Sequence, residues 1–115
     1  MIYPIQIDEL LERVSGNREF VIRMLELFFE SSDDRLATLR GEFNRHHYGE
    51  LAEQAHKLKG LVANLSINKA LTILKELNTM AEQRNDSQID KLLTELEKTI
   101  SEAKIFYQEN PSLKL

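Results

Sequence analysis

The chain has 115 residues, 42% of them hydrophobic and 30% charged, which suits one domain with a single modest core. Its formal net charge of −4 and the lack of a basic run argue against nucleic acid as a partner. The absence of cysteine excludes disulfides, thiolate metal ligands and a cysteine nucleophile. Because no apolar run could span a bilayer and no signal-peptide pattern is present, we expect no membrane insertion and a cytoplasmic location.

Hydrophobic periodicity predicts two helices in the first part of the chain. A short amphipathic helix covers about residues 7–14 and is closed by Ser15 and Gly16, where glycine can take the left-handed conformation that ends helices. Asn17 is a suitable N-cap for a long helix over about residues 17–44. Its apolar residues recur at steps of three and four: Val21, Leu25, Phe28, Leu36, Leu39 and Phe43. We expect Phe28 and Phe29 in the core and not in a binding groove.

Three further helices are predicted over about residues 48–65, 69–84 and 88–107. Ser66 or Asn68 can cap the second of these, and Asn85-Asp86-Ser87 forms a turn before the third. No segment alternates strictly between apolar and polar residues, so no sheet is expected. Short connections between long helices predict an all-α fold, an antiparallel up-down-up-down four-helix bundle forming a single domain over residues 1–115. The short N-terminal helix is expected to cap one end.

A histidine and a glycine stand inside the helix predicted over residues 48–65, in the stretch Ala55-His56-Lys57-Leu58-Lys59-Gly60. At about 100° per residue, one stripe of about 80° of arc must face the core. That stripe consists of Leu51, Ala55, Leu58, Val62 and Leu65. His56 projects more than about 100° from its middle, so we expect the imidazole on the surface.

The neighbours of His56 on that outer face are small, apart from one lysine. They are Gly49, Ala52, Lys59, Gly60 and Ala63. A helix-interior glycine costs about 1 kcal/mol relative to alanine, and we interpret Gly60 as a spacer that lets a large partner approach the imidazole. Gly49, Ala52 and Ala63, together with Lys57, are the predicted partner-binding residues.

The chemistry available at this strip is reversible phosphoryl transfer. Imidazole, whose ordinary pKa is about 6.5, offers a neutral ring nitrogen as a nucleophile near pH 7. Lys59, three residues after His56, places an ammonium on the same side, where it can interact with a phosphoryl group.

Residues 55–60 resemble the signature of histidine-containing phosphotransfer (HPt) domains of bacterial multistep phosphorelays. In that signature alanine, the phosphorylated histidine, a variable residue, an apolar residue, lysine and glycine follow one another. The segments IDELLERVSGNREFVIRMLELFFE and LTILKELNTMAEQ are also similar to the family, so the resemblance covers nearly the whole chain. The family usually has a second glycine near the end of this helix, where this sequence has Ser66.

The resemblance implies that His56 is phosphorylated, that Lys59 is its charge partner and that Gly60 is the spacer. It implies a phosphorelay intermediate that takes the phosphoryl group from the aspartyl phosphate of a receiver domain and passes it to another receiver aspartate. The expected partners are response-regulator receiver domains, with a hybrid sensor histidine kinase as a further candidate. Mg²⁺ is expected on the receiver, whereas this chain is expected to be a monomer with no cofactor, metal, ATP-binding or kinase site.

Three other interpretations fit the sequence less well. A non-catalytic helical adaptor of a signalling protein would keep the bundle but lose the histidine or the lysine, and both are present. Histidine kinases resemble one another in having an acidic residue directly after the exposed histidine and a proline one turn later. This chain has Lys57 after His56 and no proline there. A zinc site is not expected without an HExxH motif or a cysteine pair, so His46 and His47 are interpreted as solvated loop histidines near helix-terminal carbonyls.

Overall fold

The computed structural model describes residues 3–110. Within that range it contains helices α1 (Ile7–Arg13), α2 (Arg18–Asn44), α3 (Tyr48–Asn64), α4 (Asn68–Glu82) and α5 (Asp86–Glu109), and no strand. The predicted all-α class is therefore confirmed for the described residues, and each predicted helix is present with ends that differ by about two residues or less. None of these helices is both long and apolar enough to cross a membrane.

Asparagine side chains begin two of the long helices. Asn17 accepts a hydrogen bond from the Phe20 N–H at 3.1 Å, which confirms it as the N-cap of α2. Asn85 accepts one from the Gln88 N–H at 3.3 Å and begins α5 in the same way. Each bond satisfies an amide that has no partner within its helix. Because Asn85 caps the helix, residues 86 and 87 lie in α5 and not in the predicted turn.

The predicted cap of α4 is wrong. Its N-cap is Ile67, which makes no side-chain capping bond, and Asn68 is already helical. Ser66 instead ends α3: its φ is +55°, its N–H donates to the Ala63 carbonyl at 3.2 Å, and the Ile67 N–H donates to the Val62 carbonyl at 3.0 Å. This pair of bonds is a Schellman motif, which satisfies the last carbonyls of a helix.

The same left-handed ending closes α1, α2 and α4. The residues that adopt it are Ser15, His46 and Arg84, with φ between +53° and +60°. Gly16 follows Ser15 with φ +77°, as predicted for the end of the first helix. A side chain in the left-handed conformation costs about 1–2 kcal/mol. Four non-glycine residues therefore carry strain so that the chain can leave one helix and begin the next.

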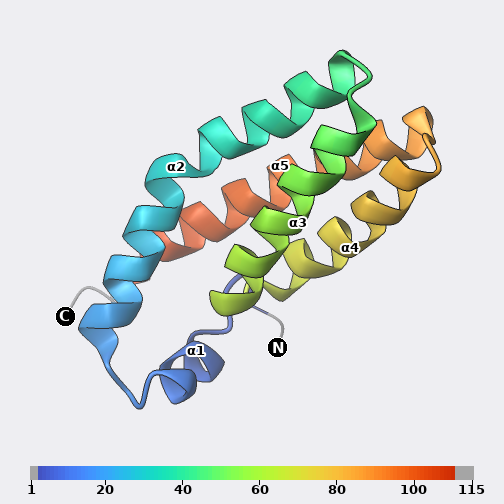
Figure 1. Ribbon diagram of the computed structural model, residues 1–115. Coiled ribbons are helices and arrows are strands. Elements are labelled where there is room, and N and C mark those ends of the chain that lie inside the picture. Colours follow the sequence, from blue (N-terminus) through green and yellow to red (C-terminus); the bar gives the residue numbers. More distant parts are fainter. Residues whose placement is uncertain (1–2, 111–115) are drawn as a thin grey trace.

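The four long helices pack side by side, with α2 and α4 each in contact with both α3 and α5 (Figure 1). Connections of three residues join them in sequence, at 45–47, 65–67 and 83–85. The molecule is elongated, with extents of 44 × 22 × 20 Å. The short helix α1 lies at the end where α3 turns into α4: the Gln6 N–H donates to the Ser66 carbonyl at 3.1 Å, and the Ser66 hydroxyl donates to Glu9 Oε1 at 3.2 Å.

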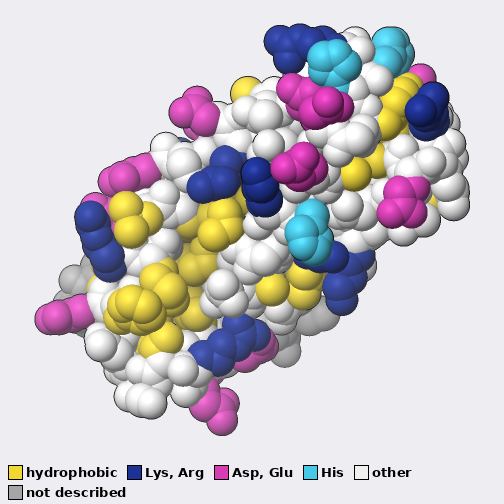
Figure 2. All heavy atoms as spheres, viewed as in Figure 1, with side chains coloured by type: hydrophobic (Ala, Val, Ile, Leu, Met, Phe, Trp, Pro, Cys, Tyr) yellow, Lys and Arg dark blue, Asp and Glu magenta, His cyan; other side chains and the backbone are white. Residues whose placement is uncertain are grey.

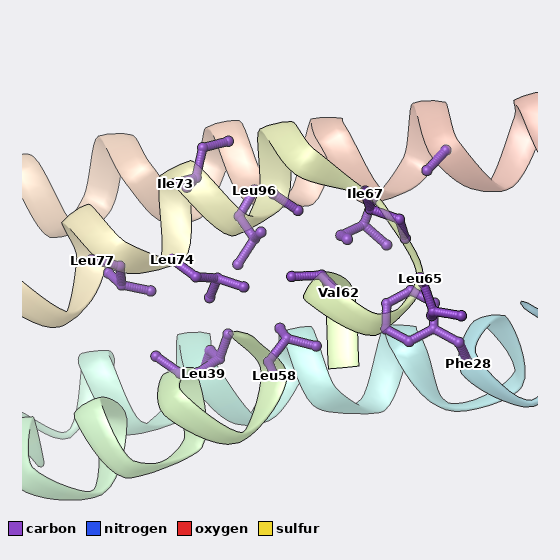
Figure 3. Close-up of a cluster of buried hydrophobic side chains, with 14 of the residues drawn as sticks. Phe28, Leu39, Leu58, Val62, Leu65, Ile67, Ile73, Leu74, Leu77 and Leu96 are labelled. Carbon is purple, nitrogen blue, oxygen red and sulfur yellow. The ribbon is translucent and has the colours of Figure 1, made fainter. Parts of the chain in front are cut away.

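The core runs along the axis of the molecule between the long helices. Leu39, Leu58, Leu74 and Leu96 come from α2, α3, α4 and α5 and point toward one another (Figure 3). Phe28 and Phe29 are each only 5% exposed, which confirms their assignment to the core. Burying side chains of this size contributes about 1.5–3 kcal/mol each. This core holds α3 in place and so positions its outer face.

A polar contact on the surface links α2 to α5. The Arg40 guanidinium donates to both carboxylate oxygens of Glu97, at 2.8 and 3.4 Å, and to Asp90 Oδ1 and Thr94 Oγ1. The hydrogen bond to Glu97, followed by that to Asp90, raises the pKa of Arg40 despite partial burial. The bidentate geometry makes this a directional contact between the two helices.

Candidate functional site

His56 lies near the middle of α3, on the side that faces away from the core. Its side chain is exposed, whereas those of Ala55 and Leu58 beside it are buried. The surface position predicted from the 3.6-residue period is therefore confirmed. Figure 2 shows histidine side chains in open view on this face, over the middle of α3 and at the end of the molecule formed by the α2–α3 turn.

The three histidines differ in what their rings contact. His46 Nδ1 lies 3.1 Å from the Tyr48 hydroxyl, and His47 Nδ1 lies 3.0 Å from Glu42 Oε2. We predicted that these two rings interact with helix-terminal carbonyls, but each contacts a neighbouring side chain instead. The ring of His56 makes no hydrogen bond or ion pair within residues 3–110. Its two nitrogens are free for a partner.

The glycines next to His56 leave open space. Gly49 and Gly60 are exposed, and a Cβ built on either one would meet no atom within 4 Å. No neighbouring helix therefore requires glycine at position 60, and its cost of about 1 kcal/mol in helix propensity is not offset by close packing inside the molecule. This side of α3 is free to receive a large partner.

The alanines of the strip lie at its edges and are only partly exposed. The Ala52 carbonyl accepts a hydrogen bond from Asn78 Nδ2 of α4 at 3.0 Å. The Ala63 carbonyl accepts one from Arg13 Nη1 of α1 at 2.6 Å. These two positions contact neighbouring helices as well as the surface, so the open part of the strip is narrower than periodicity alone indicates.

Asn78 and Arg13 make contacts with α3 that the sequence alone did not predict. Asn78 ties α4 to the turn of α3 just before His56, and its Oδ1 is buried without a hydrogen-bond partner among the described residues. Asn78 stands in a mixed stretch of α4, between Leu77 and Thr79, so the sequence offered no distinct signal for this contact. Nothing in the spacing indicated which carbonyl it would reach.

Two lysines flank the imidazole in different states. Lys59 is half-buried, and its ammonium forms no ion pair in the part of the chain that the structure describes. Lys57 is exposed, with Nζ 3.7 Å from Glu53 Oε1. An exposed pair of this kind contributes only about 0–1 kcal/mol, so a partner can displace it at little cost. The ammonium of Lys59, one helical turn from His56, is therefore available to a phosphoryl group.

An apolar groove lies between α2 and α3 and continues from the site. Its volume is about 260 Å³, and its apolar lining comprises Met24, Leu27, Phe28, Leu61 and Leu65. Asn64 at its edge follows His56 and Gly60 at four-residue steps along α3, so the groove begins on the same row of side chains. Leu27 is 48% exposed there, and Figure 2 shows hydrophobic side chains gathered on this face toward the α1 end.

Groups that could hold a metal ion lie elsewhere. Among residues 3–110, ligand atoms of histidine and carboxylate side chains come close enough together at Glu42, His47 and Glu50, around the α2–α3 turn. None of these residues belongs to the strip around His56.

Comparison with known proteins agrees with this arrangement. A family model described as "Hpt domain" matches residues 23–104, a range that contains the whole of α3 and the groove residues. No curated protein and no solved structure matches the chain.

Proposed function

The chain belongs to the Hpt domain family, and we propose on this basis that His56 carries a phosphoryl group between receiver domains. Members of this family act in two-component phosphorelays through a phosphohistidine and are carriers without kinase activity. In our proposal the group arrives from the aspartyl phosphate of one receiver and leaves to the aspartate of another. We also propose that the chain has no ATP-binding site of its own.

The choice of His56 as the phosphoryl carrier rests on how the three histidine rings differ. His56 is exposed and its ring is without a partner among the described residues, whereas the rings of His46 and His47 are each bonded to a neighbouring side chain. A histidine that accepts a phosphoryl group needs a nitrogen lone pair and room for in-line approach. His46 and His47 are held through Nδ1 only, but His56 alone of the three also has an open glycine, Gly60, one turn away on its own helix face.

The proposed transfer is a direct displacement at phosphorus. A ring nitrogen of neutral His56 attacks the phosphorus of the receiver's aspartyl phosphate, the P–N bond forms, the P–O bond breaks, and the aspartate leaves as a carboxylate. The reverse process, with a second receiver's carboxylate as the nucleophile, returns the imidazole. Lys59 stabilises the charge on the phosphoryl oxygens, and we propose that the Mg²⁺ ion required for the reaction is held by the receiver.

The bundle supplies a rigid support for this site. We propose the up-down-up-down antiparallel order for α2 to α5, supported by the three-residue connections and by the ring of helix contacts. Since His56, Lys59 and Gly60 all stand on α3, a single copy of the chain contains the whole site. We therefore propose a monomer, acting in the cytoplasm with its receiver partners.

The test is phosphoryl uptake from a labelled, phosphorylated receiver. Wild-type protein is expected to take label that is lost in acid and retained in base, and His56→Gln is expected to take none while keeping its helical content. His47→Gln serves as the control and should be labelled like wild type. Acid-stable label, or label on His56→Gln, would exclude His56 as the carrier. Receiver binding without any labelling would instead favour the adaptor function.

A further inference from the structure

A second group of chemically active side chains surrounds the α2–α3 turn, about 14 Å along α3 from His56 by helix rise. Glu42 stands in the last turn of α2, His47 is the N-cap of α3, and Glu50 is in its first turn. Their ligand atoms all lie within 4.8 Å of one another, and His47 Nδ1 is 3.0 Å from Glu42 Oε2. This group is separate from the proposed phosphoryl site.

The backbone holds two of these residues in a fixed relation. The left-handed conformation of His46 lets the His47 N–H donate to the Glu42 carbonyl at 2.9 Å. The His47 carbonyl in turn accepts the Leu51 N–H at 2.9 Å, which starts α3 and places Glu50 in its first turn. The Glu42 side chain is only 19% exposed, so its freedom is already restricted. A ligand would therefore order few additional groups.

The sequence contains no zinc motif, but the structure brings these three side chains together, and we propose that Glu42, His47 and Glu50 bind a divalent transition-metal ion of the Zn²⁺ class. One imidazole nitrogen and two carboxylate oxygens form a three-ligand set that leaves a fourth position to water. The nitrogen ligand favours Zn²⁺ over Mg²⁺ and Ca²⁺, which prefer oxygen alone.

Small movements of exposed side chains are enough to close the site. Ligand atoms about 2.0–2.2 Å from a common ion lie roughly 3.5 Å apart. Because all three ligand atoms lie within 4.8 Å of one another, no separation must shrink by more than about 1.3 Å. Arg45 Nη1, 3.6 Å from Glu42 Oε1, is the competing cation. Its side chain is 64% exposed and can swing into water.

The experiment is a calorimetric titration of the tag-free full chain with ZnCl₂, repeated with MgCl₂. We expect one Zn²⁺ per chain and an affinity lowered about tenfold or more in His47→Asn, with a smaller loss in Glu50→Gln. His46→Asn is the matched control, since asparagine tolerates the left-handed conformation there, and it should bind as wild type does. Asparagine is also a good N-cap at position 47, so His47→Asn should fold.

Three results would overturn the site: no saturable Zn²⁺ uptake by wild type, undiminished affinity in His47→Asn, or an equal loss in His46→Asn. A titration of His56→Gln separates this site from the phosphoryl site. Unchanged Zn²⁺ affinity in that variant supports the proposal, and loss of Zn²⁺ binding contradicts it.

Discussion

Substitutions of Gly60 should affect the stability of the protein and its phosphoryl transfer in opposite directions. A Cβ there meets no atom within 4 Å and the backbone is helical, so Gly60→Ala should raise the free energy of unfolding by about 1 kcal/mol in urea denaturation. Gly60→Gln should also fold, because glutamine is a good helix former, but its bulk beside His56 should slow phosphoryl transfer. Normal transfer by Gly60→Gln would remove the spacer role, and unfolding of Gly60→Ala would contradict the open space.

Ser66 combines a left-handed backbone conformation with a side-chain hydrogen bond to a neighbouring helix. It is fully buried and left-handed, and its hydroxyl donates to Glu9. Both Ser66→Gly and Ser66→Ala lose that bond, but only glycine also loses the backbone strain. Ser66→Gly should therefore be more stable than Ser66→Ala by about 1 kcal/mol, measured by urea denaturation. Equal stability of the two variants would mean that the left-handed conformation costs nothing here.

Between elements, Arg40 is the polar link that joins α2 to α5. Replacing it with alanine breaks the bidentate contact with Glu97 and the contact with Asp90, and should lower the free energy of unfolding by about 1–2 kcal/mol. Arg40→Lys should recover only part of this, because an ammonium cannot form the fork. Arg23→Ala is the control: its 3.7 Å contact with Glu26 is exposed and should contribute less than about 0.5 kcal/mol. If Arg23→Ala and Arg40→Ala lower the free energy of unfolding by similar amounts, the contact between Arg40 and α5 stabilises the protein no more than an exposed ion pair does.

For the whole molecule, we predict that a receiver docks on the face formed by α2 and α3, which carries the exposed histidine and the apolar groove. We expect Leu27, at the groove, to be covered by the receiver, so Leu27→Gln should weaken receiver binding about fivefold, equivalent to roughly 1 kcal/mol of lost apolar contact. Ile105 on α5 is equally exposed, at 48%, but lies outside the groove. Ile105→Gln should bind normally in the same titration. Equal weakening by the two changes would mean that the groove is not the docking surface.

The sequence by itself determined the helices and the outward position of His56. Both follow from the local repeat of about 3.6 residues, which sets the buried face of a helix wherever that helix packs. Local capping was less certain: Asn17 was predicted correctly, whereas Ser66 or Asn68 was expected to cap α4. Asn68 is already helical, and Ser66 instead ends α3. Serine suits either role, and the contacts of the turn with α1 select one of them.

Only the tertiary structure decided which parts of that outer face remain open. Ala52 and Gly60 are equivalent by periodicity, yet Asn78 of α4 reaches the carbonyl of one while nothing approaches the other. The apolar groove and the cluster of Glu42, His47 and Glu50 likewise combine residues from two helices. A helical repeat specifies direction around one axis, but these features depend on the distance and register between two axes. That relation is set by how the buried side chains of all four long helices fit together.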